Sequence, residues 1–137
     1  MRKILKVTLA ASLGLLAVVL AVGGATTTAA EDKTPAVGDI MKKSFGKGGY
    51  KTSIPAAAKD GKWEDAQKLA KEWADLGKVI GKNKPPKGED ASWKEQCTKF
   101  GDATKAILKA TEDKDAKAVS KSVGGFNCGA CHKQHKP

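Results

Sequence analysis

The apolar residues that follow Thr34 recur at helical spacing, and glycine or proline interrupts each run of them. The first segment ends at the glycine-rich stretch Gly46–Gly49. Its apolar face consists of Val37, Ile40, Met41, Ser44 and Phe45. No stretch shows the strict alternation of apolar and polar residues that a half-buried strand needs. The sequence therefore predicts an all-α protein.

Three further helical segments are expected, separated from the first by a looser stretch that contains Pro55. The second runs from about Lys62 to Gly81 and stops at the prolines of residues 83–90. The third begins near Ser92, with Glu95 as its capping-box partner. The fourth begins near Asp115. The apolar stripe of the second segment comprises Trp63, Ala66, Ala70, Trp73, Leu76 or Gly77, and Ile80. That of the third comprises Trp93, Cys97, Phe100, Ala103 or Thr104, Ile107 and Ala110. That of the fourth comprises Ala116, Val119, Val123, Phe126 and Ala130.

Four amphipathic helices with short links predict an antiparallel up-down-up-down four-helix bundle. The residues available to it, 31–137, form one domain with a thin core. A large apolar cofactor inside the bundle would add buried surface that the side chains alone do not supply.

Residues 1–30 have the layout of a signal peptide, with Arg2, Lys3 and Lys6 before the apolar run Val7–Val22. Cleavage after Ala25 or after Ala30 fits the preference for small residues. The alternative is an uncleaved N-terminal anchor. Either way we expect the protein in the periplasm or otherwise exported.

The charge of the chain is +10, and removal of the leader leaves 22 basic and 15 acidic residues. The lysines are spread along the chain, which indicates a solvated surface and favours a partner with an acidic docking face. An exported chain has little occasion to meet nucleic acid, so no nucleic-acid partner is expected.

The last ten residues contain Cys128, Cys131, His132 and His135, although the whole chain has only three cysteines and two histidines. A Cys-x-x-Cys pair serves dithiol exchange, zinc binding or covalent haem attachment. Dithiol exchange usually places the pair at the start of a helix that follows a strand, which this chain lacks. Zinc remains an alternative, since Cys97, Cys128 and Cys131 with His132 or His135 would make a Cys3His set in a helical binding protein.

Haem accounts for more of the sequence. The Cys128 and Cys131 thiols can add to the two vinyl groups of one porphyrin, because three residues on a helix separate them by nearly one turn. His132 lies four residues after Cys128, so its imidazole can reach the iron from the same side. This predicts one covalent haem c.

The chain resembles the class II c-type cytochromes, the cytochrome c′ family and its low-spin relatives, on "CGACH" near the end of its last helix. The resemblance implies thioether bonds at Cys128 and Cys131, His132 as axial ligand, and a single-electron carrier that is not an enzyme and has no catalytic residues. It also allows a homodimer.

The resemblance makes Met41 the candidate sixth ligand, because low-spin members carry a methionine on the first helix. The chain has Val37 where an arginine is usual, and an alignment on Phe45 would place Gly38 at the ligand position. An apolar residue there would make the protein a five-coordinate cytochrome that binds gases such as nitric oxide.

Four further residues have expectations of their own. His135 shares a helix with His132 and therefore cannot reach the opposite face of the iron, so it is expected to be solvated. Gly124 and Gly125 either make room for the porphyrin edge or mark a kink. Cys97 is expected to be a small buried residue.

Overall fold

The computed structural model describes Thr34–Pro137, which lie in one unit of the chain, Asp32–Pro137. The predicted signal peptide, residues 1–30, lies outside the described residues. The described part is all-helical and contains no strand, which confirms the predicted fold class. None of its helices is long and apolar enough to cross a membrane.

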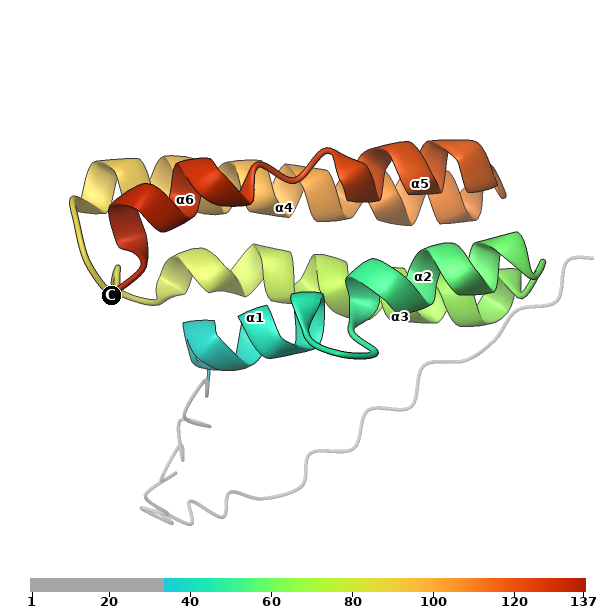
Figure 1. The fold of residues 1–137 in the computed structure, drawn as a ribbon, viewed down its shortest axis with the longest axis horizontal. Helices are drawn as coiled ribbons and strands as arrows, with labels where there is room; N and C mark the ends of the chain where they lie inside the picture. The colour runs from blue at the N-terminus through green and yellow to red at the C-terminus, as the bar shows by residue number, and fades with distance from the viewer. Residues whose placement is uncertain (1–33) are drawn as a thin grey trace, which may run out of the picture. The chain divides into compact units, whose positions relative to one another are not determined.

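Six α-helices and one short 3₁₀ turn make up this unit. They are α1 (Val37–Phe45), α2 (Tyr50–Lys59), α3 (Trp63–Val79), η1 (Ile80–Lys82), α4 (Asp90–Glu112), α5 (Ala116–Gly124) and α6 (Cys128–His135). α3 packs against α4, and α2 packs against both α3 and α5, while α4 also contacts α5 and α6. Figure 1 shows α1 and α6 at one end of the unit and α2 and α5 at the other, with α3 and α4 extending along both.

Two local predictions were wrong. The stretch around Pro55 is helical, because Tyr50, Ile54 and Ala58 recur every four residues and bury one face of α2 against the core. α4 begins at Asp90, close to the predicted start, but Ser92 is not its N-cap: the Ser92 hydroxyl donates to the Glu89 carbonyl oxygen at 3.1 Å and caps no backbone N–H. Tertiary packing overrides the local signal in the first case.

The fourth predicted helix is interrupted, and a capping side chain begins each of its two pieces. The Asp115 carboxylate accepts from the Ala118 N–H at 2.9 Å at the start of α5. The Asn127 side chain accepts from the Ala130 N–H at 3.2 Å at the start of α6. α5 ends at Gly124, so the glycine pair lies at a break in the helix.

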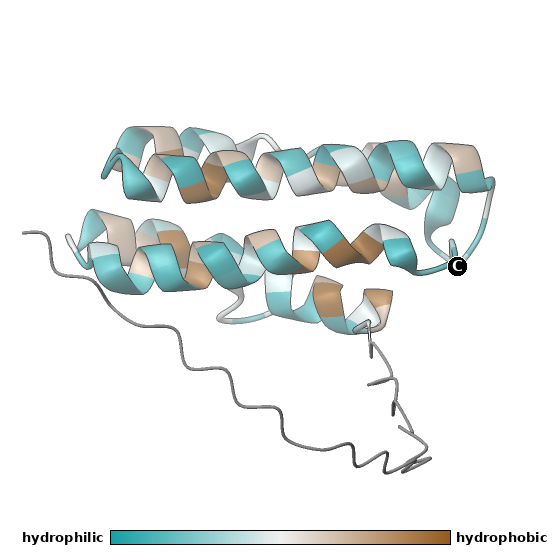
Figure 2. Ribbon diagram, turned by 180° about the vertical axis from the view of Figure 1, so that it is seen from behind, coloured by the Kyte–Doolittle hydropathy of each residue, from teal (hydrophilic) through white to brown (hydrophobic). Residues whose placement is uncertain are grey.

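The buried side chains form two clusters, one toward each end of the unit. The first cluster comprises Tyr50, Ile54, Ala58, Ala66, Ala70, Trp73, Ile107, Ala110, Val119 and Val123. The second cluster comprises Ile40, Ile80, Trp93 and Cys97. Figure 2 shows hydrophilic and hydrophobic residues interspersed along the helices, as amphipathic packing around these clusters requires.

Trp73 lies beside two connections, the one between α1 and α2 and the one between α5 and α6. Its side chain is fully buried, and its indole N–H donates to the Ser44 hydroxyl at 2.8 Å. Phe45, the last residue of α1, and Phe126, just before α6, have ring centroids 5.4 Å apart and 5.8 and 5.0 Å from Trp73. Aromatic contacts with Trp73 therefore hold the end of α1 and the segment just before α6 at the same level of the core.

α3 and α4 approach most closely through glycine. A Cβ built on Gly77 would collide with the Thr104 hydroxyl and lie 3.1 Å from the Gly101 Cα. By contrast, a Cβ built on Gly38 in α1 would meet nothing within 4 Å. The α3–α4 contact therefore depends on the missing side chain at Gly77.

We expect Gly77→Ala to lower the free energy of unfolding by roughly 1–3 kcal/mol, because the added methyl overpacks the contact. Gly38→Ala is the matched control and should raise it by up to about 1 kcal/mol, since alanine favours helix. Urea unfolding followed by far-UV circular dichroism measures both. Equal effects of the two substitutions would contradict the close approach.

Candidate functional site

The three residues of the predicted attachment site lie on α6, whose first residue is Cys128. Cys128 and His132 are exposed, and Cys131 is half-buried. Helical spacing brings the two sulfurs and the imidazole to neighbouring positions over one turn. α6 lies at one end of the unit (Figure 1), so the two thiols and the imidazole that it carries belong to that end.

Cys131 also packs against the second cluster, on Ile40, Ile80, Trp93 and Cys97. The partly buried side chains that pack there with it are Val37, Met41, Leu76 and Phe100. Met41 comes from α1 and Cys131 from α6. The predicted sixth ligand and one predicted thioether site therefore border the same apolar cluster from different helices.

These residues fit a covalently attached haem. The exposed Cys128 and half-buried Cys131 can form the thioether bonds, and His132 is free of the core and can ligate the iron. The second cluster supplies the apolar surroundings that a porphyrin needs. Met41 is half-buried at its border, which suits either a ligand or a core residue.

The thiol of Cys97 differs from that of Cys128 in its surroundings. The pKa of Cys97 is raised to about 11, mainly because the thiol is buried and to a smaller extent because Cys131 lies nearby. Burial also raises the pKa of Cys131, with Cys128 as the smaller cause. Since the thiolate is the nucleophile, Cys97 is the least suited of these thiols to covalent chemistry at neutral pH. It is buried on α4, as the sequence predicted.

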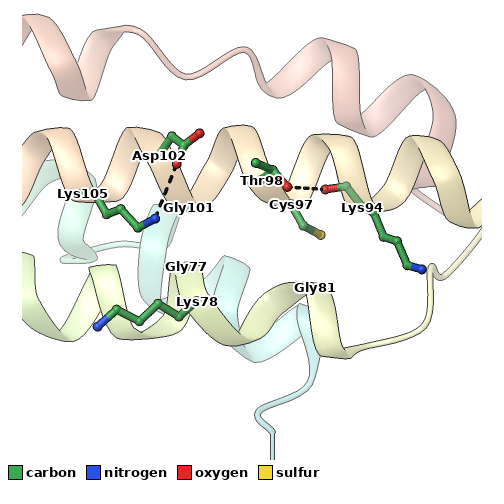
Figure 3. A pocket seen from close by; sticks show the side chains of 9 residues that line it. All are labelled: Gly77, Lys78, Gly81, Lys94, Cys97, Thr98, Gly101, Asp102 and Lys105. Carbon is green, nitrogen blue, oxygen red and sulfur yellow. Dashed lines mark hydrogen bonds and ion pairs between the residues drawn. The ribbon is translucent and has the colours of Figure 1, made fainter.

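A groove of about 500 Å³ lies between α3 and α4 beside Cys97. Figure 3 shows the Cys97 sulfur directed into it from α4, with Gly77 of α3 and Gly81 of η1 on the facing side. Lys78, Lys94 and Lys105 also line it, and Lys105 pairs with Asp102 at 3.6 Å. None of the α6 residues lines this groove, so it is separate from the candidate attachment site.

The prediction that His135 is solvated was wrong. Its side chain is 2 % exposed, with Nδ1 2.7 Å from the Lys87 carbonyl oxygen and Nε2 3.1 Å from the Ser92 hydroxyl. The residues that bury it lie more than forty positions earlier in the chain. The one local signal is its spacing of four residues from Cys131, which places the two on one face of α6.

The residues of the alternative zinc set are not gathered into one site. Among residues 34–137, no three His, Cys, Asp or Glu side chains are grouped so that they could hold a metal ion. Both ring nitrogens of His135 already lie within hydrogen-bond distance of other groups.

Exposed lysines flank the helices that border the second cluster. Lys42 and Lys43 follow Met41 on α1, and Lys133 and Lys136 follow His132 at the end of α6. Such a basic edge raises the rate of encounter with acidic surfaces. Comparison of the chain with protein-family models, curated proteins and solved structures finds no match.

We expect Cys97 to react with iodoacetamide at least about tenfold more slowly at pH 8 than free N-acetylcysteine. A pKa of about 11 lowers its thiolate fraction, and the higher nucleophilicity of that thiolate offsets only part of the loss. The haem-free Cys128→Ser/Cys131→Ser chain isolates this thiol. Its labelling rate should keep rising with pH above about pH 10, where the rate of an ordinary thiol levels off, because burial still raises the pKa of Cys97 in this variant. A plateau by about pH 10 would contradict the raised pKa.

Proposed function

We propose that the protein is an exported mono-haem c-type cytochrome that carries single electrons. The observation that carries the proposal is the joint placement of Cys128, Cys131 and His132 on α6, with Cys131 bordering an apolar cluster that Met41 also borders. The resemblance to class II c-type cytochromes rests on the same residues. Exported location agrees with the signal-like sequence of residues 1–30.

The finer fold belongs to the same proposal: an antiparallel up-down-up-down bundle of four helices. In it, α1 with α2 and α5 with α6 each act as one interrupted helix. Two contacts support an antiparallel arrangement of α3 and α4. The Gln67 side chain donates a hydrogen bond to the Thr111 carbonyl oxygen, and Gly77 lies close to Gly101. As the residue number rises on one helix, it falls on the other.

The residues divide the work as follows. Cys128 and Cys131 would each form a thioether bond by adding a thiol across a vinyl group, and the thiol hydrogen goes to the neighbouring carbon. His132 would supply an imidazole ligand, and Met41 a thioether ligand from α1. Haem, when bound, supplies an iron that changes its oxidation state by one electron. The second cluster would exclude water around it, which favours the less charged ferrous state.

The lysines beside Met41 and His132 support an acidic redox partner. Their charge would orient such a partner toward the end of the unit that carries α1 and α6. The proposal assigns no catalytic residue, since the chain's part in electron transfer is to hold, shield and orient the iron.

The full chain should acquire haem that resists extraction by acidic acetone when it is made with a c-type haem attachment system. Cys128→Ala/Cys131→Ala should lose that haem because both thioether sites are gone. Cys97→Ala is the matched control and should keep it, since Cys97 is buried on another helix. Absorption spectra after extraction measure the result. A parent chain that holds zinc and no haem would support the zinc alternative and contradict the proposal.

Met41→Ala should abolish the far-red charge-transfer band of methionine-ligated ferric haem. It should also lower the reduction potential by roughly 0.1–0.2 V, part of the ~0.8 V range that axial ligands set. Val37→Ala is the matched control, because Val37 packs against the same cluster without a ligand atom. A high-spin ferric spectrum in the parent chain would instead support the five-coordinate, gas-binding alternative.

A further inference from the structure

α6 carries the whole attachment motif but has little holding it in place. It is eight residues long, and its one buried residue is His135, outside the motif. A helix this short does not persist in water without tertiary contacts. Since α5 ends at Gly124, the helix that precedes α6 does not support it directly. Besides the half-buried Cys131, which packs against the second cluster, the position of α6 therefore depends on how His135 is held.

His135 is held by polar contacts at both ring nitrogens. The Lys87 carbonyl oxygen, 2.7 Å from Nδ1, can only accept a hydrogen bond, so Nδ1 carries the hydrogen. The Ser92 hydroxyl lies 3.1 Å from Nε2. The ring also makes an edge contact with Trp93, with centroids 5.3 Å apart.

The connection between α3 and α4 is shaped around this ring. Gly88 has a φ of +84°, a conformation that side chains other than glycine adopt at a cost. A Cβ at Gly88 would lie 2.7 Å from the Gln134 carbonyl oxygen and 3.1 Å from His135 Nδ1. Glycine therefore lets the connection pass close enough for the Lys87 carbonyl to reach the ring.

The same connection also holds the start of α1. The Asn83 side chain donates to the Pro35 carbonyl at 3.1 Å, two residues before α1 begins. The Trp93 indole N–H donates to the Asn83 carbonyl at 2.7 Å. Residues 83–89 thus contact the helix that carries His132 at one point and the segment just before the helix that carries Met41 at another.

We infer that His135 is a positioning residue. Its hydrogen bonds to Lys87 and Ser92 fix α6 on the α3–α4 connection and so set where His132 lies relative to α1. The two histidines of the chain then have separate roles, with the exposed His132 as ligand and the buried His135 as anchor. The part of this inference that concerns iron rests on the proposed function, whereas the anchoring of α6 does not.

The first test uses the full chain without haem and measures amide hydrogen exchange. In His135→Leu the amides of α6 should exchange roughly tenfold faster or more, because the anchor's hydrogen bonds are lost. His135→Asn should restore most of the protection, since its amide can donate where Nδ1 does. Ser92→Ala removes one contact without changing the core and should give an intermediate rate.

The matched control is Gln67→Ala, which removes a 3.1 Å side-chain bond to the Thr111 carbonyl near the opposite end of α3 and α4. It should leave exchange in α6 unchanged. Unchanged α6 exchange in His135→Leu, or equal exchange in the Leu and Asn variants, would overturn the anchoring role.

The second test measures the iron in the haem-loaded chain. His135→Leu should lower the reduction potential and weaken the charge-transfer band of methionine ligation, while His135→Asn and Gln67→Ala should match the parent. Faster exchange in α6 without any change at the iron would overturn positioning. A parent chain without haem would refute the proposed function, and the exchange experiment would still decide whether His135 anchors α6.

Discussion

The burial of Trp73 is the constraint on which the rest of the unit depends. Its indole is fully buried, donates to Ser44 and stacks between Tyr50 and Phe126 at centroid distances of 5.7 and 5.0 Å. These partners come from α1, α2 and the segment before α6. One side chain on α3 therefore contacts α1, α2 and the segment before α6, and burial of so large a ring accounts for a sizeable part of the core.

The two ends of the unit differ in which helices pack there and in the size of the buried cluster. Beyond Trp73 on one side, α2 and α5 pack against each other and against the long helices around the first cluster. On the other side, the smaller second cluster is bordered by Met41 of α1 and Cys131 of α6. α1 and α6 are helices separate from α2 and α5, and they border this smaller cluster. The proposed function would place the haem at this end.

Local periodicity predicted the elements whose burial repeats along one helix. The apolar spacing from Val37 to Phe45 gave the bounds of α1, and the stripe from Trp63 to Ile80 gave α3 with its 3₁₀ end. The start of the fourth segment near Asp115 was also predicted, and the structure shows that Asp115 caps it by accepting from the Ala118 N–H. The same reasoning missed α2, where Pro55 outweighed a repeat of buried residues that only the packing makes decisive.

The candidate site divides in the same way. The motif residues Cys128, Cys131 and His132 are adjacent in sequence, so their common helix could be predicted. The burial of His135 could not, because Lys87 and Ser92 are 48 and 43 positions away and meet it only in the fold. A positive φ at Gly88 makes that meeting sterically feasible, and no spacing in the sequence reports it.

The most direct test of the central claim is the mass of one tryptic peptide. Cleavage after Lys121 and Lys133 releases Ser122–Lys133, which contains Cys128, Cys131 and His132 but not Cys97. When the chain is made with a haem attachment system, we predict that this peptide carries the added mass of one haem. Alkylation of the unfolded chain before digestion should then modify Cys97, which lies in another peptide, but neither Cys128 nor Cys131. A Ser122–Lys133 peptide without haem and with two alkylated cysteines would contradict the account.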